Sequence, residues 1–414
     1  MTSRPKAAPQ ESDIPRGFSF ASAACGIKKS GLDLALLISE TPAAAAAVFT
    51  TNRVQAAPVV TSQFHLRQSR GKMRAIIVNS GNANCCTGSD GLAASRRTTA
   101  EVARTLACRA DEILVCSTGV IGVPLRVEKI LRAVPAIVRA RRANAAAFAQ
   151  LTRAIMTTDT RPKWAAAKFR TGGKEVRLIG SAKGAGMIEP HMATMLSFIT
   201  ADAAISPALL DRALRLAVGP TFNSITVDGD TSTNDTLAIL ANGQSGAPKI
   251  TREDSAYRKF CAALESVCHS LALAIVADGE GAQRVIEIEV RGAPSASAAG
   301  RIARTIANSP LVKTALAGGD PNWGRILAAG GRASIDRGPA GAGFDPNRTD
   351  IRLAGILVCR RGCEHPFSER AAHRRMLAKF VPIVLDLHSG RAAARVWTCD
   401  FTGEYVQINA SYRT

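Results

Sequence analysis

Long hydrophobic runs and aromatic residues are both scarce in this 414-residue sequence. No stretch reaches the roughly 18 consecutive apolar residues that a membrane-spanning helix requires, and the alanine-rich run Pro42–Phe49 is much shorter. Phe, Trp and Tyr make up only 5% of the residues, so the aromatic platforms on which nucleic-acid bases stack are few. We therefore expect neither a membrane span nor a base-stacking surface.

Acidic residues are outnumbered by basic ones. The chain has 53 Lys and Arg against 33 Asp and Glu, a net charge of +20. Such an excess raises nucleic acid or an anionic surface as a partner. The basic residues nevertheless occur in small groups, such as Arg139, Arg141 and Arg142, which solvated helix faces explain. We expect no nucleic-acid partner, and the charge suits acidic small-molecule substrates.

Cysteine is too sparse for a disulfide scaffold, with ten residues at irregular spacings. We expect reduced thiols in a reducing compartment. Cys359, Cys363 and His365 form a C-x3-C-x-H cluster without a convincing fourth ligand, so we expect no zinc there. The aspartates of Asp228–Asp235 lack the distal glutamate of a calcium-binding hand and are interpreted as a structural turn.

The start of the chain lacks the apolar core of a secretory signal. Met1–Gly17 is polar and carries charges of both signs, which is not typical of an export sequence. We expect residues 1–17 to form a flexible tail on a cytoplasmic protein.

The apolar pattern mixes strands with helices. Arg74–Val78 and Ile113–Cys116 have the pattern of short buried strands, and Val285–Val290 alternates as a strand with one solvated face. Ser206 and Pro207 begin a helix that Gly219 and Pro220 end. We also expect one or two helices in Val123–Ala149 and surface loops at Arg291–Gly300 and Gly338–Gly343. The expected class is mixed α/β (α+β), with layered sheets flanked by helices, in two or three packed units or in one large unit with two lobes.

Nucleotide-binding signatures are absent. Neither G-x-x-x-x-G-K-[ST] nor a G-x-G-x-x-G that opens a helix occurs. Small polar residues and glycine instead concentrate in five stretches, which suit the surroundings of a small ligand: Asn79–Gly88, Ser117–Gly122, Lys183–Thr194, Thr226–Thr236 and Asp320–Arg325.

Thr194 has the setting of a self-processing nucleophile. It follows Ala193 and a glycine-rich approach and precedes Met195–Ile199, an expected apolar strand. A threonine hydroxyl in such a position can attack the preceding carbonyl, and hydrolysis of the ester leaves a free α-amine. That amine has a pKa of roughly 7.7–8.0, so it can accept the hydroxyl proton near neutral pH. From the pattern alone, an ordinary threonine in a strand is the favoured interpretation.

Ten motifs in order along the chain resemble the ornithine acetyltransferase family, the glutamate N-acetyltransferases of arginine biosynthesis. They are GIKKSGLDLAL (Gly26–Leu36), FTTNRVQAAPV (Phe49–Val59), NSGNAN (Asn79–Asn84), STGVIG (Ser117–Gly122), KGAGMIEPHMATMLSFITADA (Lys183–Ala203), ITVDGDTSTNDT (Ile225–Thr236), DGEGA (Asp278–Ala282), IANSPLVKTA (Ile306–Ala315), DPNWGRI (Asp320–Ile326) and INASYRT (Ile408–Thr414). Two departures are Ser411, where we expect an acidic residue, and Cys85, where alanine is usual.

The resemblance implies cleavage between Ala193 and Thr194. The products are an alpha chain, residues 18–193 after the tail, and a beta chain, residues 194–414, which remain associated as α2β2. It also implies an N-terminal-threonine acyltransferase fold. Thr194 is then the nucleophile that carries acetyl from N-acetylornithine to glutamate in a ping-pong reaction, with Thr118 and Gly119 as the oxyanion donors.

Further residues match substrate-binding positions of the family. The resemblance assigns this role to Thr158, Lys183, Glu280, Asn409 and Thr414, with Thr157 as an alternative to Thr158. Lys183 suits a carboxylate and Glu280 an ammonium group. Asn409 and Thr414 lie at the C-terminus, so a binding role requires this tail to be ordered.

Three questions remain open from the sequence. No motif decides whether acetyl-CoA is a co-substrate, and no other cofactor or metal is implied. A related fold with an N-terminal serine hydrolyses peptide-like bonds, so an aminopeptidase or amidase is the alternative enzyme. A basic nucleic-acid-binding protein is the third interpretation and predicts salt-sensitive binding.

Overall fold

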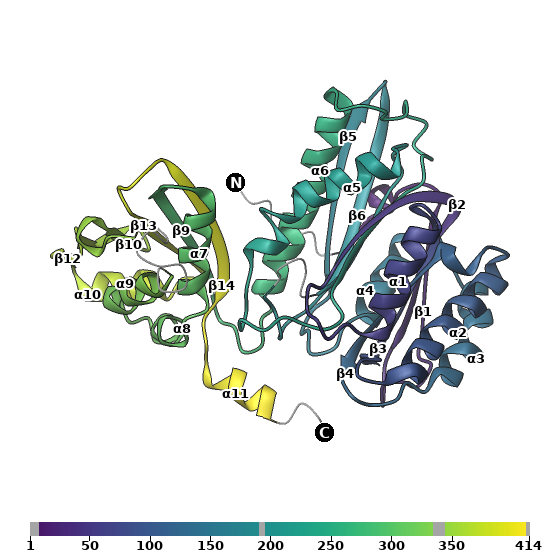
Figure 1. Cartoon of the computed structure of the whole chain (residues 1–414), viewed down its shortest axis with the longest axis horizontal. Coiled ribbons are helices and arrows are strands. Elements are labelled where there is room, and N and C mark those ends of the chain that lie inside the picture. The colour runs from purple at the N-terminus through teal and green to yellow at the C-terminus, as the bar shows by residue number, and fades with distance from the viewer. Residues whose placement is uncertain (1–7, 190–194, 334–343, 411–414) are drawn as a thin grey trace. The chain divides into compact units, whose positions relative to one another are not determined.

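The computed structural model describes residues 8–189, 195–333 and 344–410, which divide into two compact units (Figure 1). Unit 1 comprises Met1–Gly184, Pro190–Asn223 and Thr231–Ala272. Unit 2 comprises Ala185–Glu189, Ser224–Asp230 and Leu273–Thr414. Each unit has its own sheet and core, in agreement with the expected two or three packed units.

Unit 1 is built on a mixed eight-stranded sheet. The order is β4-β3-β2-β8-β7-β6-β5, and β1 pairs with β2 off this path. The pairs β3/β4 and β7/β8 are parallel and the others are antiparallel. The strands are β1 (Phe18–Ala23), β2 (Leu34–Phe49), β3 (Lys72–Asn82), β4 (Ile113–Val120), β5 (Lys163–Thr171), β6 (Lys174–Lys183), β7 (Leu196–Ala201) and β8 (Thr236–Ala241).

Helices cover both faces of this sheet. They are α1 (Ala57–Gln68), α2 (Gly88–Leu106), α3 (Val127–Arg139), α4 (Ala145–Ala154), α5 (Pro207–Val218) and α6 (Ser255–Val276) (Figure 1). Alternate residues of β2 point to opposite faces, as the period of a strand requires. Leu36 packs in a cluster with α2 and α3, whereas Leu37 packs in another with α4. The sheet is therefore buried from both sides, which explains why its strands carry apolar residues on both faces.

Helix α6 is apolar and long enough to cross a membrane by length and composition alone, the one such helix among the described residues. Half of its apolar window is buried inside the structure. Its side chains Val267 and Leu271 lie against Gly180 of β6, where an added Cβ would meet them at 3.1 Å. This contact is that of a core helix on a sheet.

Unit 2 contains a six-stranded sheet, in the order β12-β11-β10-β13-β9-β14, and only β13/β9 is parallel. The strands are β9 (Val285–Ala293), β10 (Asp350–Leu353), β11 (Ile356–Arg360), β12 (Cys363–Glu364), β13 (Phe380–Asp386) and β14 (Ala392–Cys399). The helices are α7 (Ala296–Ala307), α8 (Pro310–Gly318), α9 (Trp323–Arg332), α10 (Glu369–Met376) and α11 (Gly403–Ala410). Ile286, Ile288 and Val290 of β9 enter the core, which confirms the predicted one-sided strand.

Most predicted elements are confirmed, including the helix of α5 with its Ser206 cap, whose hydroxyl accepts the Leu209 N–H at 3.3 Å. The expected loop at Arg291–Gly300 is wrong. Strand β9 continues to Ala293, and α7 begins at Ala296 with the Ser295 hydroxyl accepting the Ala298 N–H at 3.1 Å. A serine cap before alanines favours a helix, although the composition resembles a loop. The other expected loop, Gly338–Gly343, lies outside the described residues.

Part of the segment that we expected to form a flexible tail is folded. A short 3-10 helix covers Glu11–Asp13, and Ile14 is 5% exposed. Asp13 forms an ion pair with Lys168 at 3.4 Å, and Arg16 forms one with Asp202 at 2.9 Å. Residues 11–16, which we expected to belong to a flexible tail, are therefore packed on unit 1.

The predicted chain boundary at Ala193 and Thr194 lies outside the described residues, and it does not coincide with the boundary between the units. Strands β7 and β8 follow it in sequence, yet β7 pairs with β6 and β8 pairs with β2. The sheet of unit 1 is consequently built from both predicted chains.

Candidate active site

Buried amide side chains fix the ends of β3 and β4 in unit 1. The Ser117 hydroxyl donates to the Asn79 side chain at 2.6 Å, and the Asn79 amide donates to the Asn82 carbonyl at 2.9 Å. Asn234 donates to the carbonyls of Ala83 at 2.6 Å and Ser117 at 2.8 Å. Because buried backbone groups need partners, these amides hold the two strand ends, and they explain the NSGNAN motif.

Thr118 and Gly119 lie in β4, which continues past the predicted strand Ile113–Cys116 as far as Val120. Gly119 pairs with Gly81 of β3 and has a φ of 133°. A Cβ on Gly119 would approach the carbonyl carbon of Gly81 to 2.3 Å, a contact that real side chains do not make. The close approach of the two strands therefore requires glycine at position 119.

Lys183, at the end of β6, contacts Thr118. Its ammonium group donates a hydrogen bond to Thr118 Oγ1 at 3.1 Å. An ammonium has donors only, so the Thr118 oxygen must be the acceptor, and its own O–H proton remains able to donate elsewhere. The structure thus brings together two of the predicted site residues. The Lys183 ammonium group polarises the Thr118 hydroxyl, which we expected to act as an oxyanion donor.

A buried carboxylate anchors this arrangement. Asp159 accepts hydrogen bonds from Lys163 Nζ and the Gly184 N–H, each at 2.6 Å, and from the Thr157 N–H at 3.0 Å. Burial alone would raise the pKa of Asp159, but the charges of Lys183 and Lys163 and the Gly184 N–H outweigh it and lower the pKa to about 2. Asp159 is thus ionised at neutral pH and electrostatically stabilises Lys183.

Lys28 is a second lysine of this region that sequence reasoning missed. Its ammonium donates to the carbonyls of Leu32 at 3.1 Å and Met156 at 2.7 Å. Burial lowers the pKa of Lys28, Asp33 opposes that effect, and the charge of Lys183 adds to it. The loop that carries Lys28 is fixed by the Asp33 carboxylate, which accepts the N–H groups of Cys25, Ile27 and Lys28 at 2.6 to 3.0 Å. The GIKKSGLD motif, which contains both Lys28 and Asp33, was the feature of the sequence that could have identified this lysine.

In unit 2 the predicted residues Glu280 and Asn409 contact each other. The Asn409 amide, in α11, donates to Glu280 Oε2 at 2.7 Å. The Glu280 N–H donates to the carbonyl of Ala185 at 2.9 Å, and a Cβ on Gly186 would meet the Glu280 carboxylate at 2.3 Å. The expected ordering of the C-terminal segment is confirmed as far as Ala410.

For the remaining predicted residues, the structure either does not choose between alternatives or does not describe the residue. Thr157 and Thr158 are both partly buried, so the choice between them stays open. Ala193, Thr194 and Thr414 lie outside the described residues, and their roles stay predictions.

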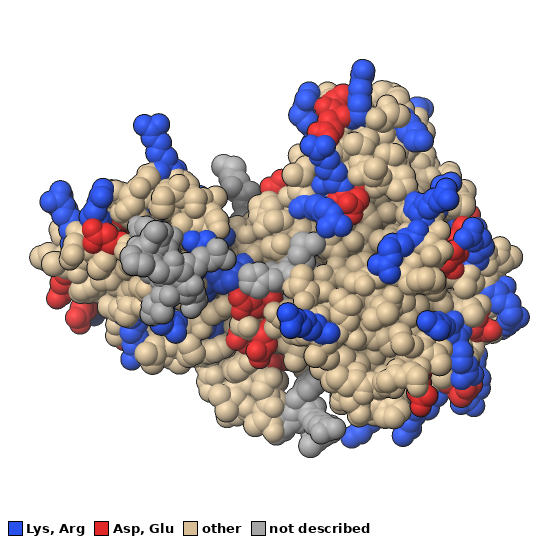
Figure 2. Space-filling model, viewed as in Figure 1, with Lys and Arg blue, Asp and Glu red and all other residues tan. Residues whose placement is uncertain are grey.

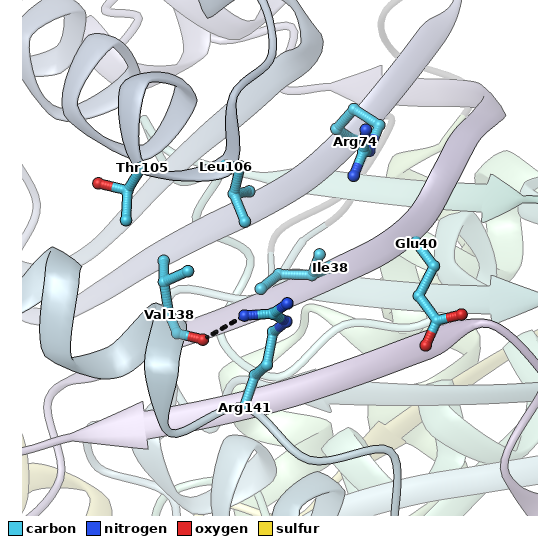
Figure 3. A pocket seen from close by; sticks show the side chains of 7 residues that line it. All are labelled: Ile38, Glu40, Arg74, Thr105, Leu106, Val138 and Arg141. Atoms are coloured by element: carbon cyan, nitrogen blue, oxygen red, sulfur yellow. Dashed lines mark hydrogen bonds between the residues drawn. The ribbon is translucent and has the colours of Figure 1, made fainter.

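In the part of the chain that the structure describes, no three or more His, Cys, Asp or Glu residues are grouped so that they could hold a metal ion. A pocket of about 200 Å³ lies elsewhere in unit 1 and contains none of the predicted site residues (Figure 3). Ile38, Glu40, Arg74, Thr105, Leu106, Val138 and Arg141 line it. Arg141 donates to the Val138 carbonyl at 2.8 Å, as the dashed line in Figure 3 marks.

Basic side chains are scattered over the face shown in Figure 2, with acidic ones among them, and they do not merge into one continuous patch there. The arrangement on this face matches the small groups seen in the sequence.

Comparison with known proteins identifies the family. The ArgJ family model matches residues 19–414, nearly the whole chain. The chain belongs to the ArgJ family. The arginine biosynthesis bifunctional protein ArgJ of Thermotoga neapolitana is 46% identical, over 97% of this chain and 100% of the relative, and that of Geobacter sulfurreducens is 46% identical over 96% and 99%.

Two solved structures of the ArgJ family are also similar in sequence. ArgJ from Bacillus halodurans is 40% identical, with 52% of this chain and 98% of that chain covered and a TM-score of 0.49. An ornithine acetyltransferase from Mycobacterium tuberculosis, solved with ornithine, is 40% identical, with 44% and 96% covered and a TM-score of 0.40. The family model and the relatives that are 46% identical confirm the resemblance that the ten motifs indicated.

The first prediction concerns the approach of β3 and β4. Gly119→Ala should lower the free energy of unfolding by about 3 kcal/mol or more, because it combines an unfavourable φ with a clash against Gly81. Gly122→Ala is the matched control: its φ is also positive, at 80°, but a Cβ there has no neighbour within 4 Å. Urea denaturation measures both. Equal losses in the two variants would contradict the steric argument.

The second prediction concerns the depressed pKa of Asp159. A carboxyl whose pKa is lower in the folded state contributes stability that is present at neutral pH and lost as pH falls through the folded pKa. The wild type should therefore lose about 2 kcal/mol between about pH 4 and pH 2 through this group. Asp159→Asn should be less stable at pH 7, and its deficit should shrink over that same range.

The surface pair Asp211 and Arg215 supplies the control for Asp159. These side chains are about half exposed and 2.8 Å apart on α5, so Asp211→Asn should cost less than about 0.5 kcal/mol. Denaturant unfolding at a series of pH values compares the variants. A deficit of Asp159→Asn that is the same at pH 7 and pH 2 would exclude the proposed ionisation.

Proposed function

We propose that this chain is a self-processing acetyltransferase of arginine biosynthesis, which moves acetyl from N2-acetylornithine to glutamate through an ester on Thr194. Membership of the ArgJ family supports it, as do relatives 46% identical along nearly the whole chain that are named for arginine biosynthesis. The ornithine complex of the 40% identical M. tuberculosis enzyme supports a small amino acid as ligand. The observation that carries it is the contact of Lys183 with Thr118, beside Gly119.

The first step is the cleavage that creates the nucleophile. The Thr194 hydroxyl attacks the carbonyl carbon of Ala193, and the C–N bond breaks to leave an ester and a free α-amine. Water then hydrolyses the ester. The liberated amine has a pKa of roughly 7.7–8.0 when unperturbed, which suits it to take the proton of its own hydroxyl.

The second step is acetyl transfer in two halves. Thr194 Oγ attacks the acetyl carbonyl of N2-acetylornithine, ornithine leaves with a proton, and the amine of glutamate then attacks the acetyl ester. Each half passes through a tetrahedral oxyanion, which the Thr118 O–H and the Gly119 N–H stabilise by donation. The Lys183 bond to the Thr118 oxygen keeps that O–H available as a donor. Preorganised donors of this type contribute about 10²–10³ in rate each.

Substrate contacts follow the family pattern. We assign Lys183 to a substrate carboxylate and Glu280 to an ammonium group, with Thr158, Asn409 and Thr414 as further contacts. Neither half-reaction requires a group beyond the protein and the amino acids, so we propose no metal and no resident cofactor. We further propose that the cleaved chains act as α2β2 in the cytoplasm, with no nucleic-acid or membrane partner. The pairing of β7 with β6 and of β8 with β2 supports continued association of the chains.

The third prediction tests Thr194. Thr194→Ala should give a single full-length band on a denaturing gel and no glutamate-dependent release of ornithine from N2-acetylornithine, because both steps need the hydroxyl. Thr194→Ser keeps a hydroxyl and should still be cleaved, so it separates chemistry from folding. N-terminal sequencing locates the cut. A Thr194→Ala protein still split after Ala193 would overturn self-cleavage, and acetate release independent of glutamate would favour an amidase.

The fourth prediction concerns the acetyl donor. We propose that acetyl-CoA also acetylates Thr194, because the Thermotoga and Geobacter relatives are named bifunctional. Wild-type protein supplied with glutamate should then form N-acetylglutamate from acetyl-CoA as well as from N2-acetylornithine, and Thr194→Ala should form it from neither. Thiol release measures the first reaction. Turnover with N2-acetylornithine alone would limit the enzyme to transfer between the two amino acids.

A further inference from the structure

The segment Ala185–Glu189 precedes the proposed cleavage bond by four residues and is held by hydrogen bonds within unit 2. Asp228 makes two of them, since its carboxylate accepts the N–H of Met187 at 2.6 Å and that of Ile188 at 2.8 Å. Met187 has a φ of 55°, in the left-handed region that is strained for residues with a side chain. The Asp228 carboxylate thus stabilises a backbone turn that methionine does not favour.

The carbonyl groups of the segment are held as well. The carbonyl of Ile188 accepts the Val227 N–H at 2.7 Å and lies 3.1 Å from the Thr226 hydroxyl. At the other end, the carbonyl of Ala185 accepts the Glu280 N–H at 2.9 Å. Donors on both sides of the chain therefore fix its path.

The last residue of the segment is fixed by its side chain. Glu189 is 8% exposed, and its carboxylate accepts a hydrogen bond from the Asn308 amide at 2.6 Å and lies 3.6 Å from the Arg304 guanidinium. Asn308 in turn lies 2.8 Å from the Thr226 hydroxyl through its own oxygen. These contacts hold the chain where it enters the residues before the cut.

We propose that Asp228 is a positioning residue for self-cleavage, because its carboxylate fixes the turn at Met187 and Ile188 a few residues before the proposed cleavage bond. The inference rests on the proposed function. This inference gives a role to Asp228 of the DGD motif (Asp228–Asp230), which we interpreted from the sequence only as part of a structural turn. Intramolecular attack depends strongly on alignment, and a misplacement of about 1 Å costs about 10²-fold in rate.

The same contacts also bear on the cleaved protein. Every partner named for the segment, Thr226, Val227, Asp228, Glu280, Arg304 and Asn308, follows Thr194 in the sequence. The hydrogen bonds therefore join the end of the first chain to the second chain, and cleavage breaks none of them. Asp228 consequently helps to keep this end of the first chain bound after the cut.

The test compares Asp228→Asn with Asp230→Asn in the full chain. Asp230 is an exposed acid of the same motif, and its variant removes the same charge two residues away. Each protein is made by cell-free synthesis with a short radiolabelled pulse, and the full-length band is followed on a denaturing gel. We expect Asp228→Asn to be cleaved about 10- to 100-fold more slowly than wild type, and Asp230→Asn to match wild type.

Thermal unfolding of the same proteins separates positioning from folding. Slow cleavage by an Asp228→Asn protein of unchanged Tm supports the inference, and cleavage at the wild-type rate overturns it. If Asp228→Asn does not fold, Glu189→Gln tests the same segment by removing only the charge that faces Arg304, and slow cleavage of that folded variant is the supporting result. Wild-type cleavage by folded Glu189→Gln then overturns the inference.

Thr194→Ala, made in parallel, distinguishes a failure of the proposed function from a failure of the role assigned to Asp228. A cut in Thr194→Ala means that the proposed function fails, whatever Asp228 does. An intact Thr194→Ala together with normal cleavage of Asp228→Asn means that only the role of Asp228 fails.

Discussion

The ionised carboxylate of Asp159 is the constraint on which the arrangement in unit 1 depends. A buried charge is stable only when it is paired and hydrogen-bonded, and Asp159 meets this condition with Lys163, the Gly184 N–H and the Thr157 N–H. These partners come from β5, from the residue after β6 and from the loop before β5. The carboxylate thus joins the backbone near Thr158 to the end of β6, where Lys183 contacts Thr118 of β4. A shift of any one partner would remove a hydrogen bond from this buried charge.

Steric fit between two strands supplies the second constraint. Gly81 and Gly119 approach so closely that only glycine fits at position 119. Buried amide groups, including those of Asn79 and Asn234, then satisfy the strand ends. Rigidity of this kind is what oxyanion donors need, because they stabilise developing charge only if they are already in place when it appears.

Much of the fold and part of the site follow from local sequence pattern. Strand periodicity located β7 and β9, and cap and breaker residues located α5, because those signals lie within a few adjacent residues. The resemblance indicated Thr118, Lys183, Glu280 and Asn409, and the structure shows which of these touch. Asp159 and Lys28 were missed because their importance arises from burial and from partners far away in sequence, which no local pattern contains. The helix of α7 was missed because its composition resembles a loop, although its serine cap was visible.

On the proposed mechanism, self-processing places two different demands on the chain, and separate residues meet them. Acetyl transfer needs fixed donors, which Thr118 and Gly119 supply in unit 1 with the support of Lys183 and Asp159. Cleavage needs the residues before the cut to be held, and in unit 2 Asp228 holds a strained turn at Met187. Apart from Thr194, which acts in both steps, the residues proposed for the two steps are different, so the turn before the cut can be held without involving the donors that every later turnover requires. Because cleavage breaks none of the Asp228 contacts, the turn at Met187 persists in the cleaved protein, where it helps to keep the end of the first chain bound.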